Sequence, residues 1–148
     1  MNKRKVKATI SMALFLLLVG IVLISGCGSG HHHHHGASVV SSEKVFTIDL
    51  SQKAEYQPLL RGEPQTHGMR SGRVYLKPGE SCGEHSTEAH EEQLVFLSGK
   101  GTALIGKEQT AYEIGEGKII YIPPYTTHDM KNTGTEPLVY IYCVTPVK

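Results

Sequence analysis

The chain has 148 residues, which is enough for one domain and too few for two. Tryptophan is absent, and 16 glycines and 7 prolines divide the sequence densely, which favours a turn-rich β structure over helices. The formal net charge is only +1 and no basic patch with interleaved aromatic residues occurs, so nucleic acid is excluded as an expected partner.

Residues 1–26 have the order of a secretory signal peptide. The basic segment Lys3–Lys7 precedes the apolar run Ile10–Ile24, which only Ser11 and Gly20 interrupt. Removing the four basic residues of this segment from the total of 15 leaves 11 against 14 acidic ones, a mature charge near −3. The alternative is an uncleaved transmembrane anchor, but the run is shorter than the ~20 residues that a spanning helix prefers.

The apolar run ends in Leu23-Ile-Ser-Gly-Cys27, which resembles the lipobox of bacterial-type lipoproteins. In those proteins the cysteine becomes the first mature residue and carries the lipid. The resemblance implies that Cys27 is the lipidation site, and that the domain is anchored at the extracytoplasmic face of the cell membrane.

Residues 27–43 are expected to form a flexible tether, because they are too polar and too rich in small residues to pack a core. The tether contains five consecutive histidines, His31–His35. This run is either an expression tag or a metal-collecting tract, and under neither interpretation is it the active site.

Residues 44–148 are predicted to form one all-β domain. Short segments with strand character alternate with turn signals such as Pro78-Gly79 and Pro123-Pro124. Many short strands at even spacing indicate a sandwich or barrel. Residues 52–72 are the least regular part. The expected strands are Val45–Leu50, Arg73–Leu76, Gln93–Leu97, Gly101–Ile105, Thr110–Ile114, Lys118–Ile122, His128–Lys131 and Leu138–Val144.

Histidine and glutamate are concentrated in one stretch, Gly79–Gly99, which contains His85, His90, Glu91 and Glu92 and then becomes an apolar strand. A further imidazole, His128, follows in Gly117–Asn132. Neutral imidazole nitrogen and carboxylate oxygen are the ligands that suit divalent iron, manganese, zinc, nickel or cobalt. The sequence therefore predicts one divalent transition metal, whose identity stays open.

The two stretches together resemble the two sequence motifs of the cupin family. The first motif is matched by Gly79, His85, Glu92 and Gly99, and the second by Gly117, Pro123, His128 and Asn132, with Tyr125 where a glycine is usual. The resemblance extends from about Arg73 to the C-terminus. It implies a double-stranded β-helix, or jelly-roll barrel, with a single metal inside.

The sequence departs from the family pattern at Thr87, where the second histidine of a His-x-His pair is expected. His90 stands two residues before Glu92, and residues i and i+2 of a strand project from the same face. The predicted ligands are therefore His85, His90, Glu92 and His128. Thr87 and Glu91 are alternatives, and a degenerate or empty site is also open.

Other residues around the motifs have weaker signals. Met130 and Asn132 share the face of His128 on a strand and are expected to line the cavity. Arg70, Arg73 and Tyr75 could meet an anionic substrate near the mouth, or could simply be solvated. Cys82 and Cys143 form either a disulfide or a pair of free thiols.

Two classes of function remain open at this point. The family resemblance implies a metal-dependent enzyme acting on a small molecule, of dioxygenase, isomerase or lyase type, and the fold cannot choose among these. The membrane anchor and the histidine tract favour a noncatalytic protein that binds metal or a small ligand. In either case, the resemblance implies a homodimer formed through an outer sheet or the amino-terminal strand.

Overall fold

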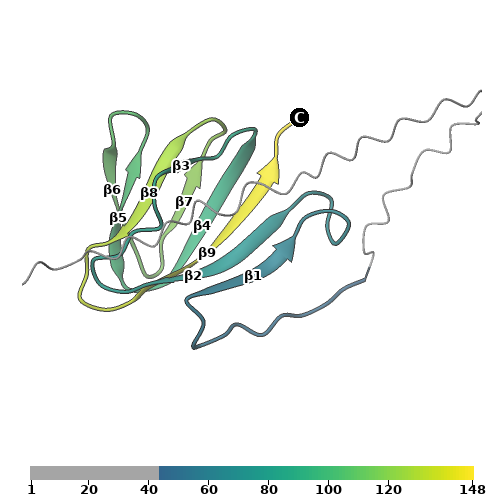
Figure 1. Ribbon diagram of the computed structural model, residues 1–148, viewed down its shortest axis with the longest axis horizontal. Coiled ribbons are helices and arrows are strands. Elements are labelled where there is room, and N and C mark those ends of the chain that lie inside the picture. The colour runs from purple at the N-terminus through teal and green to yellow at the C-terminus, as the bar shows by residue number, and fades with distance from the viewer. Residues whose placement is uncertain (1–43) are drawn as a thin grey trace, which may run out of the picture. The chain divides into compact units, whose positions relative to one another are not determined.

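The computed structural model describes residues 44–148, and within this range it contains nine β-strands and no helix (Figure 1). None of these residues belongs to a helix long and apolar enough to cross a membrane. The expected signal peptide, the lipidated Cys27 and the tether lie outside the described residues. The strands are β1 (Tyr56–Arg61), β2 (Arg70–Leu76), β3 (His85–Ser86), β4 (His90–Ser98), β5 (Lys100–Ile105), β6 (Thr110–Gly115), β7 (Ile119–Ile122), β8 (Thr127–Asn132) and β9 (Leu138–Pro146).

The strands form two antiparallel sheets, which Figure 1 shows side by side. One sheet has the order β1-β2-β9-β4-β7 and the other has the order β3-β8-β5-β6. The last strand, β9 (yellow in Figure 1), lies between β2 and β4, so the C-terminal residues pair with both. This is the predicted all-β double-stranded β-helix, and it is confirmed.

The core lies between the two sheets and follows the period-two alternation of the strands. Along β4, Glu92, Leu94 and Phe96 are buried, whereas the alternate residues Gln93 and Leu97 are exposed. Phe96 packs against Tyr140 of β9 with 5.4 Å between ring centroids. The other buried apolar residues come from both sheets: Val74, Leu76, Cys82, Ala103, Ile114, Ile122, Met130 and Leu138.

The sequence prediction was wrong at the amino-terminal end of the domain. Val45–Leu50 alternates apolar and polar residues, but it forms no strand, and its apolar side chains are exposed. The edge of β2 is occupied instead by β1, from the segment expected to be irregular. Pro58 weakened the strand signal there, since proline is tolerated only on edge strands or at bulges. β1 is such an edge strand, with a register shift between Pro58 and Leu60.

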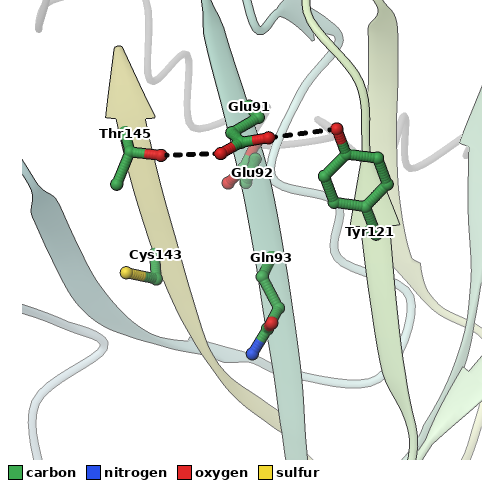
Figure 2. Close-up of a pocket in the computed structure, with 6 residues that line it drawn as sticks. All are labelled: Glu91, Glu92, Gln93, Tyr121, Cys143 and Thr145. Carbon is green, nitrogen blue, oxygen red and sulfur yellow. Dashed lines mark hydrogen bonds between the residues drawn. The ribbon is translucent and has the colours of Figure 1, made fainter. Parts of the chain in front are cut away.

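The two cysteines of the described domain are free thiols, of which Cys82 is buried and Cys143 is half-buried. The Cys82 thiol is buried and accepts the backbone N–H of Met130 at 3.2 Å. Cys143 lies on the outer face of β9, beside Thr145 and Gln93 (Figure 2). The disulfide alternative is therefore not realised.

We predict that only one of these thiols is readily alkylated in the folded protein. Burial raises the pKa of Cys82 to about 12, so the reactive thiolate is scarce at pH 8. Burial also raises the pKa of Cys143, but that residue is only half-buried. Iodoacetamide followed by peptide mass spectrometry should find Cys143 modified and Cys82 protected, and urea should expose both. Equal modification of both thiols before unfolding would contradict this packing.

Candidate metal centre

Three strands bring His85, Glu92 and His128 together between the sheets. Their ligand atoms all lie within 4.8 Å of one another. His85 of β3 and His128 of β8 are direct partners in one sheet, and their ring centroids are 4.2 Å apart. Glu92 reaches them from β4 of the other sheet. The centre therefore spans the two layers of the barrel, and its ligands are distant in sequence but adjacent in the fold.

Backbone carbonyl groups orient both imidazoles. The Nδ1 atom of His85 lies 2.8 Å from the carbonyl oxygen of Gly83, and that of His128 lies 3.2 Å from the carbonyl oxygen of Thr126. A carbonyl oxygen can only accept, so Nδ1 carries the proton in each ring. The Nε2 lone pair of each histidine is then free to bind a metal, which is the usual arrangement of metal-binding histidines.

The contact between His128 and Glu92 tests whether the site fits a cation. The Nε2 atom of His128 lies 3.1 Å from Oε2 of Glu92, and the two side chains are 1% and 8% exposed. Because Nε2 and an ionised carboxylate oxygen both carry lone pairs, a proton or a metal ion must balance them in this dry position. Two imidazoles and one carboxylate are a donor set that divalent iron, zinc, manganese, nickel and cobalt accept. The residues present therefore could hold a metal.

The other two ligand candidates on β4 lie elsewhere. His90 does project from the same face as Glu92, but its Nε2 atom is 3.1 Å from Nη2 of Arg70. Glu91 faces outward, where its carboxylate accepts hydrogen bonds from the hydroxyls of Tyr121 and Thr145 (Figure 2). Neither belongs to the three-residue cluster. Ligation by His90 stays a prediction, which a metal titration can test.

Thr87, which replaces the usual second histidine, links the two motifs. Its buried hydroxyl donates to the carbonyl oxygen of Pro123 at 2.9 Å and accepts the backbone N–H of Thr126 at 2.9 Å. The carbonyl group of the same Thr126 accepts Nδ1–H of His128. The hydroxyl thus holds Thr126, the residue whose carbonyl group orients the candidate ligand His128.

We predict that Thr87→Val lowers metal affinity about 10- to 100-fold, the range for residues that orient a ligand. Valine keeps the volume but leaves the Thr126 N–H without its acceptor, so the loop before His128 can shift. The matched control is Thr87→Ser, which keeps the hydroxyl and should bind within a few-fold of wild type. A chelator competition titration measures both, and equal affinities for valine and serine would refute the role.

Asp129 is a positioning residue that sequence reasoning missed. Its carboxylate accepts the backbone N–H of Gly83 at 3.0 Å and the Ser81 hydroxyl at 2.7 Å. It therefore holds the turn whose carbonyl group orients His85. The only signal in the sequence was that an acidic residue directly follows His128, and it could not show that the carboxylate reaches a loop 46 residues away.

Met130 and Asn132 are both buried, as expected for inward-facing residues of β8. Met130 packs in the apolar core. The Asn132 amide donates to the carbonyl oxygens of Leu76 and Glu136 and accepts the N–H of Gly134, so it is committed to the turn that follows β8. These contacts indicate a packing role for Met130 and a turn-stabilising role for Asn132.

Tyr125 occupies the second-motif position where a glycine is usual. Its φ angle is +55°, in the left-handed region that favours glycine, and its ring is exposed. Its N–H donates to the carbonyl oxygen of Glu88 at 2.7 Å. The backbone conformation of the motif is thus kept in spite of the side chain.

A depression of about 260 Å³ lies on the outer face of the five-stranded sheet (Figure 2). It is lined by Glu91, Gln93, Tyr121, Cys143 and Thr145, together with Glu92. Successive residues of a strand point to opposite faces, so the Glu92 side chain faces the barrel interior while its neighbours face this depression. The depression is therefore separate from the metal centre.

Two curated proteins illustrate the sequence likeness. The chain is 30% identical over 99 residues to the mannose-1-phosphate guanylyltransferase of Salmonella typhimurium, covering 63% of this chain and 20% of that protein. It is 35% identical over 60 residues to the glucose-6-phosphate isomerase of Pyrococcus abyssi, covering 38% of this chain and 32% of that protein. The chain thus spans less than a third of the length of these relatives.

The fold is also found in solved structures. A protein of Bacillus halodurans superimposes with a TM-score of 0.62 at 19% sequence identity, covering 72% of this chain and 85% of that chain. Residues 72–145, half of the chain, match the family model described as the cupin domain. This matched segment contains all three residues of the metal cluster. The chain belongs to the cupin family.

Proposed function

We propose that this cupin is a metal-dependent enzyme acting on a small molecule, with one divalent metal held by His85, Glu92 and His128. The observation that carries the proposal is the number of clustered ligands. Three protein ligands are typical of catalytic metal sites, which keep a position for water or substrate, whereas structural sites are closed by four. His85 is exposed, so one side of the cluster is open to solvent.

Each residue has a defined task in this proposal. The Gly83 and Thr126 carbonyl groups keep the two imidazoles as Nδ1–H tautomers, so that both Nε2 atoms stay available. The Glu92 carboxylate supplies negative charge in a water-poor position. A bound divalent metal would supply Lewis acidity toward a substrate oxygen. Dioxygenase, isomerase and lyase chemistry all remain compatible with such a set. The isomerase and guanylyltransferase activities belong to the relatives and support only a small-molecule substrate.

The alternative is a noncatalytic protein that binds metal or a small ligand, which the proposed membrane anchor favours. A protein with serines in place of His31–His35 should first be analysed for its native metal, because that run binds metal on its own. Loading with Mn²⁺ and measuring water-proton relaxation then tests for an exchangeable water. Strong enhancement supports an open, catalytic site. If the Mn²⁺-loaded protein shows no exchangeable water, the catalytic interpretation is contradicted and a storage or structural role for the metal is favoured.

We also propose that the chain is a lipoprotein anchored at the extracytoplasmic face of the membrane. The support is the sequence of residues 1–27, namely the basic start, the apolar run and the small residues before Cys27. Cys27→Ser should accumulate as unprocessed precursor without a labelled acyl chain. Normal cleavage and labelling of that variant would show that the assignment is wrong.

A homodimer is the assembly that we propose. Its support is the exposed apolar surface of Phe46, Ile48 and Leu50, together with Ile119 on β7, which is 66% exposed. Burying such surface against a second copy would stabilise the assembly. Light scattering after size exclusion should give twice the chain mass, and Phe46→Glu combined with Ile48→Glu should give the monomer.

A further inference from the structure

Arg70 is the first residue of β2 and makes a contact that the candidate metal cluster does not use. Its Nη2 atom lies 3.1 Å from Nε2 of His90. A guanidinium group only donates, so the ring nitrogen of His90 is the acceptor. No ion pair among residues 44–148 includes Arg70, whose side chain is exposed to solvent. The guanidinium is thus oriented by an imidazole and has no carboxylate partner among these residues.

The strand register places this cation on the same face as the metal centre. Glu92 pairs with Val144, and Val144 pairs with Arg70, so the three residues form one row across β4, β9 and β2. Directly paired residues of antiparallel strands project to the same side. Two strand spacings separate the Cα atoms of Glu92 and Arg70 by about 10 Å. Both side chains are long, so a small molecule can reach from one group to the other.

Tyr142 lies in the next row, between the cation and the carboxylate. It pairs with Leu94 on one side and with Gly72 on the other. A Cβ atom on Gly72 would come within 2.7 Å of the Tyr142 ring, so the glycine makes room for that ring over β2. The Tyr142 hydroxyl lies 2.7 Å from the Tyr56 hydroxyl.

The pKa of Tyr142 reports on both charged groups. Burial, the hydrogen bond with Tyr56 and the nearby Glu92 all raise the pKa of this phenol, whereas Arg70 lowers it. The strand order agrees with this, since Tyr142 lies on β9, between the strands that carry Arg70 and Glu92. A phenol hydroxyl can donate a hydrogen bond to an oxyanion.

We propose that Arg70, oriented by His90 and flanked by Tyr142, binds an oxyanion at the far end of a small ligand whose near end reaches the metal. The substrate class is then a small dianion with a carboxylate or a phosphate at the Arg70 end. Arginine suits this task because its planar fork binds either group through two parallel hydrogen bonds. The inference rests on the proposed metal-dependent function and identifies the chemistry of its ligand.

Isothermal titration calorimetry tests the proposal. The sample is the full-length chain in detergent, with serines at His31–His35 and with Mn²⁺ bound. The titrants are butyrate as the monoanion, succinate and glutarate as dicarboxylates, and 2-phosphoglycolate for a phosphate end. The best dianion should bind about 10- to 100-fold more tightly than butyrate, the effect expected of charged hydrogen bonds. Arg70→Gln should abolish this preference and leave the affinities for butyrate and Mn²⁺ within about threefold of wild type, which is about 0.7 kcal/mol.

Two further variants keep the test sharp. Arg70→Lys keeps the positive charge but loses the planar guanidinium group that makes two parallel hydrogen bonds. It should therefore retain only part of the preference for dianions over butyrate. Lys131→Gln removes the same charge from an exposed position on β8 and should change nothing. Stronger binding of 2-phosphoglycolate than of the dicarboxylates would assign the subsite to phosphate, and the reverse order would assign it to carboxylate.

The outcomes separate this inference from the proposed function. Mn²⁺ binding without any Arg70-dependent preference for dianions would overturn the subsite and leave the metal centre intact. Equal loss of dianion and monoanion binding in Arg70→Gln would also overturn it. Failure of the Mn²⁺ titration itself would overturn the proposed function, and the subsite would fall with it.

Discussion

Glu92→Gln and His85→Ala are each expected to lower metal affinity by more than about 100-fold, beyond the range for residues that only orient a ligand. Glu92→Gln removes the anionic donor but keeps the size of a buried side chain. His85→Ala removes a nitrogen donor at an exposed position, so the fold should tolerate it. A chelator competition titration on protein with serines at His31–His35 measures both.

His90→Ala distinguishes the structure from the sequence-based ligand set. Ligation by His90 predicts a loss as large as that of His85→Ala. His90 instead contacts Arg70 and lies outside the cluster of three, which predicts a metal affinity within about threefold of wild type, or about 0.7 kcal/mol. A hundredfold loss of metal affinity in His90→Ala would show that His90 is a ligand and would refute the three-ligand centre. Wild-type affinity in all three variants would place the metal elsewhere.

Phe96→Ala is expected to reduce the free energy of unfolding by about 3–5 kcal/mol, the usual cost of truncating a buried aromatic residue. The Phe96 side chain is 2% exposed and packs against Tyr140 between the sheets. Truncation leaves a cavity that the rigid strands on both sides cannot fill. The midpoint of urea unfolding, followed by circular dichroism at constant m-value, measures the loss.

The neighbouring Leu97→Ala is the matched control. Leu97 is 40% exposed and lies on the opposite face of the same strand, so its truncation should cost less than about 1 kcal/mol. Equal losses in the two variants would mean that β4 does not present its even-numbered residues to the core. The same register places Glu92 inside the barrel, so the control also checks the position of a candidate metal ligand.

Strands with one buried face were predictable because their sequences alternate. The predicted strand His128–Lys131 alternates the buried residues His128 and Met130 with the polar residues Asp129 and Lys131, and the observed strand β8 contains it. Val45–Leu50 has a similar pattern but no partner strand, since β1 already occupies the edge of β2. Alternation of apolar and polar residues indicates which side chains prefer burial. It does not indicate whether the edge of a neighbouring strand is free to pair. The two-residue strand β3 is too short to show any period.

The spacing of the motifs in the sequence determined the family, the barrel and three members of the metal cluster, His85, Glu92 and His128. These could be predicted from the sequence because strand register fixes which residues face the core, so the number of residues between a turn and an inward-facing side chain is constrained. The hydrogen-bond partners of Thr87 and His90 were revealed only by the tertiary structure. Thr87 bonds to Pro123 and His90 to Arg70, and such partners are brought together by the pairing of distant strands, which no local pattern encodes.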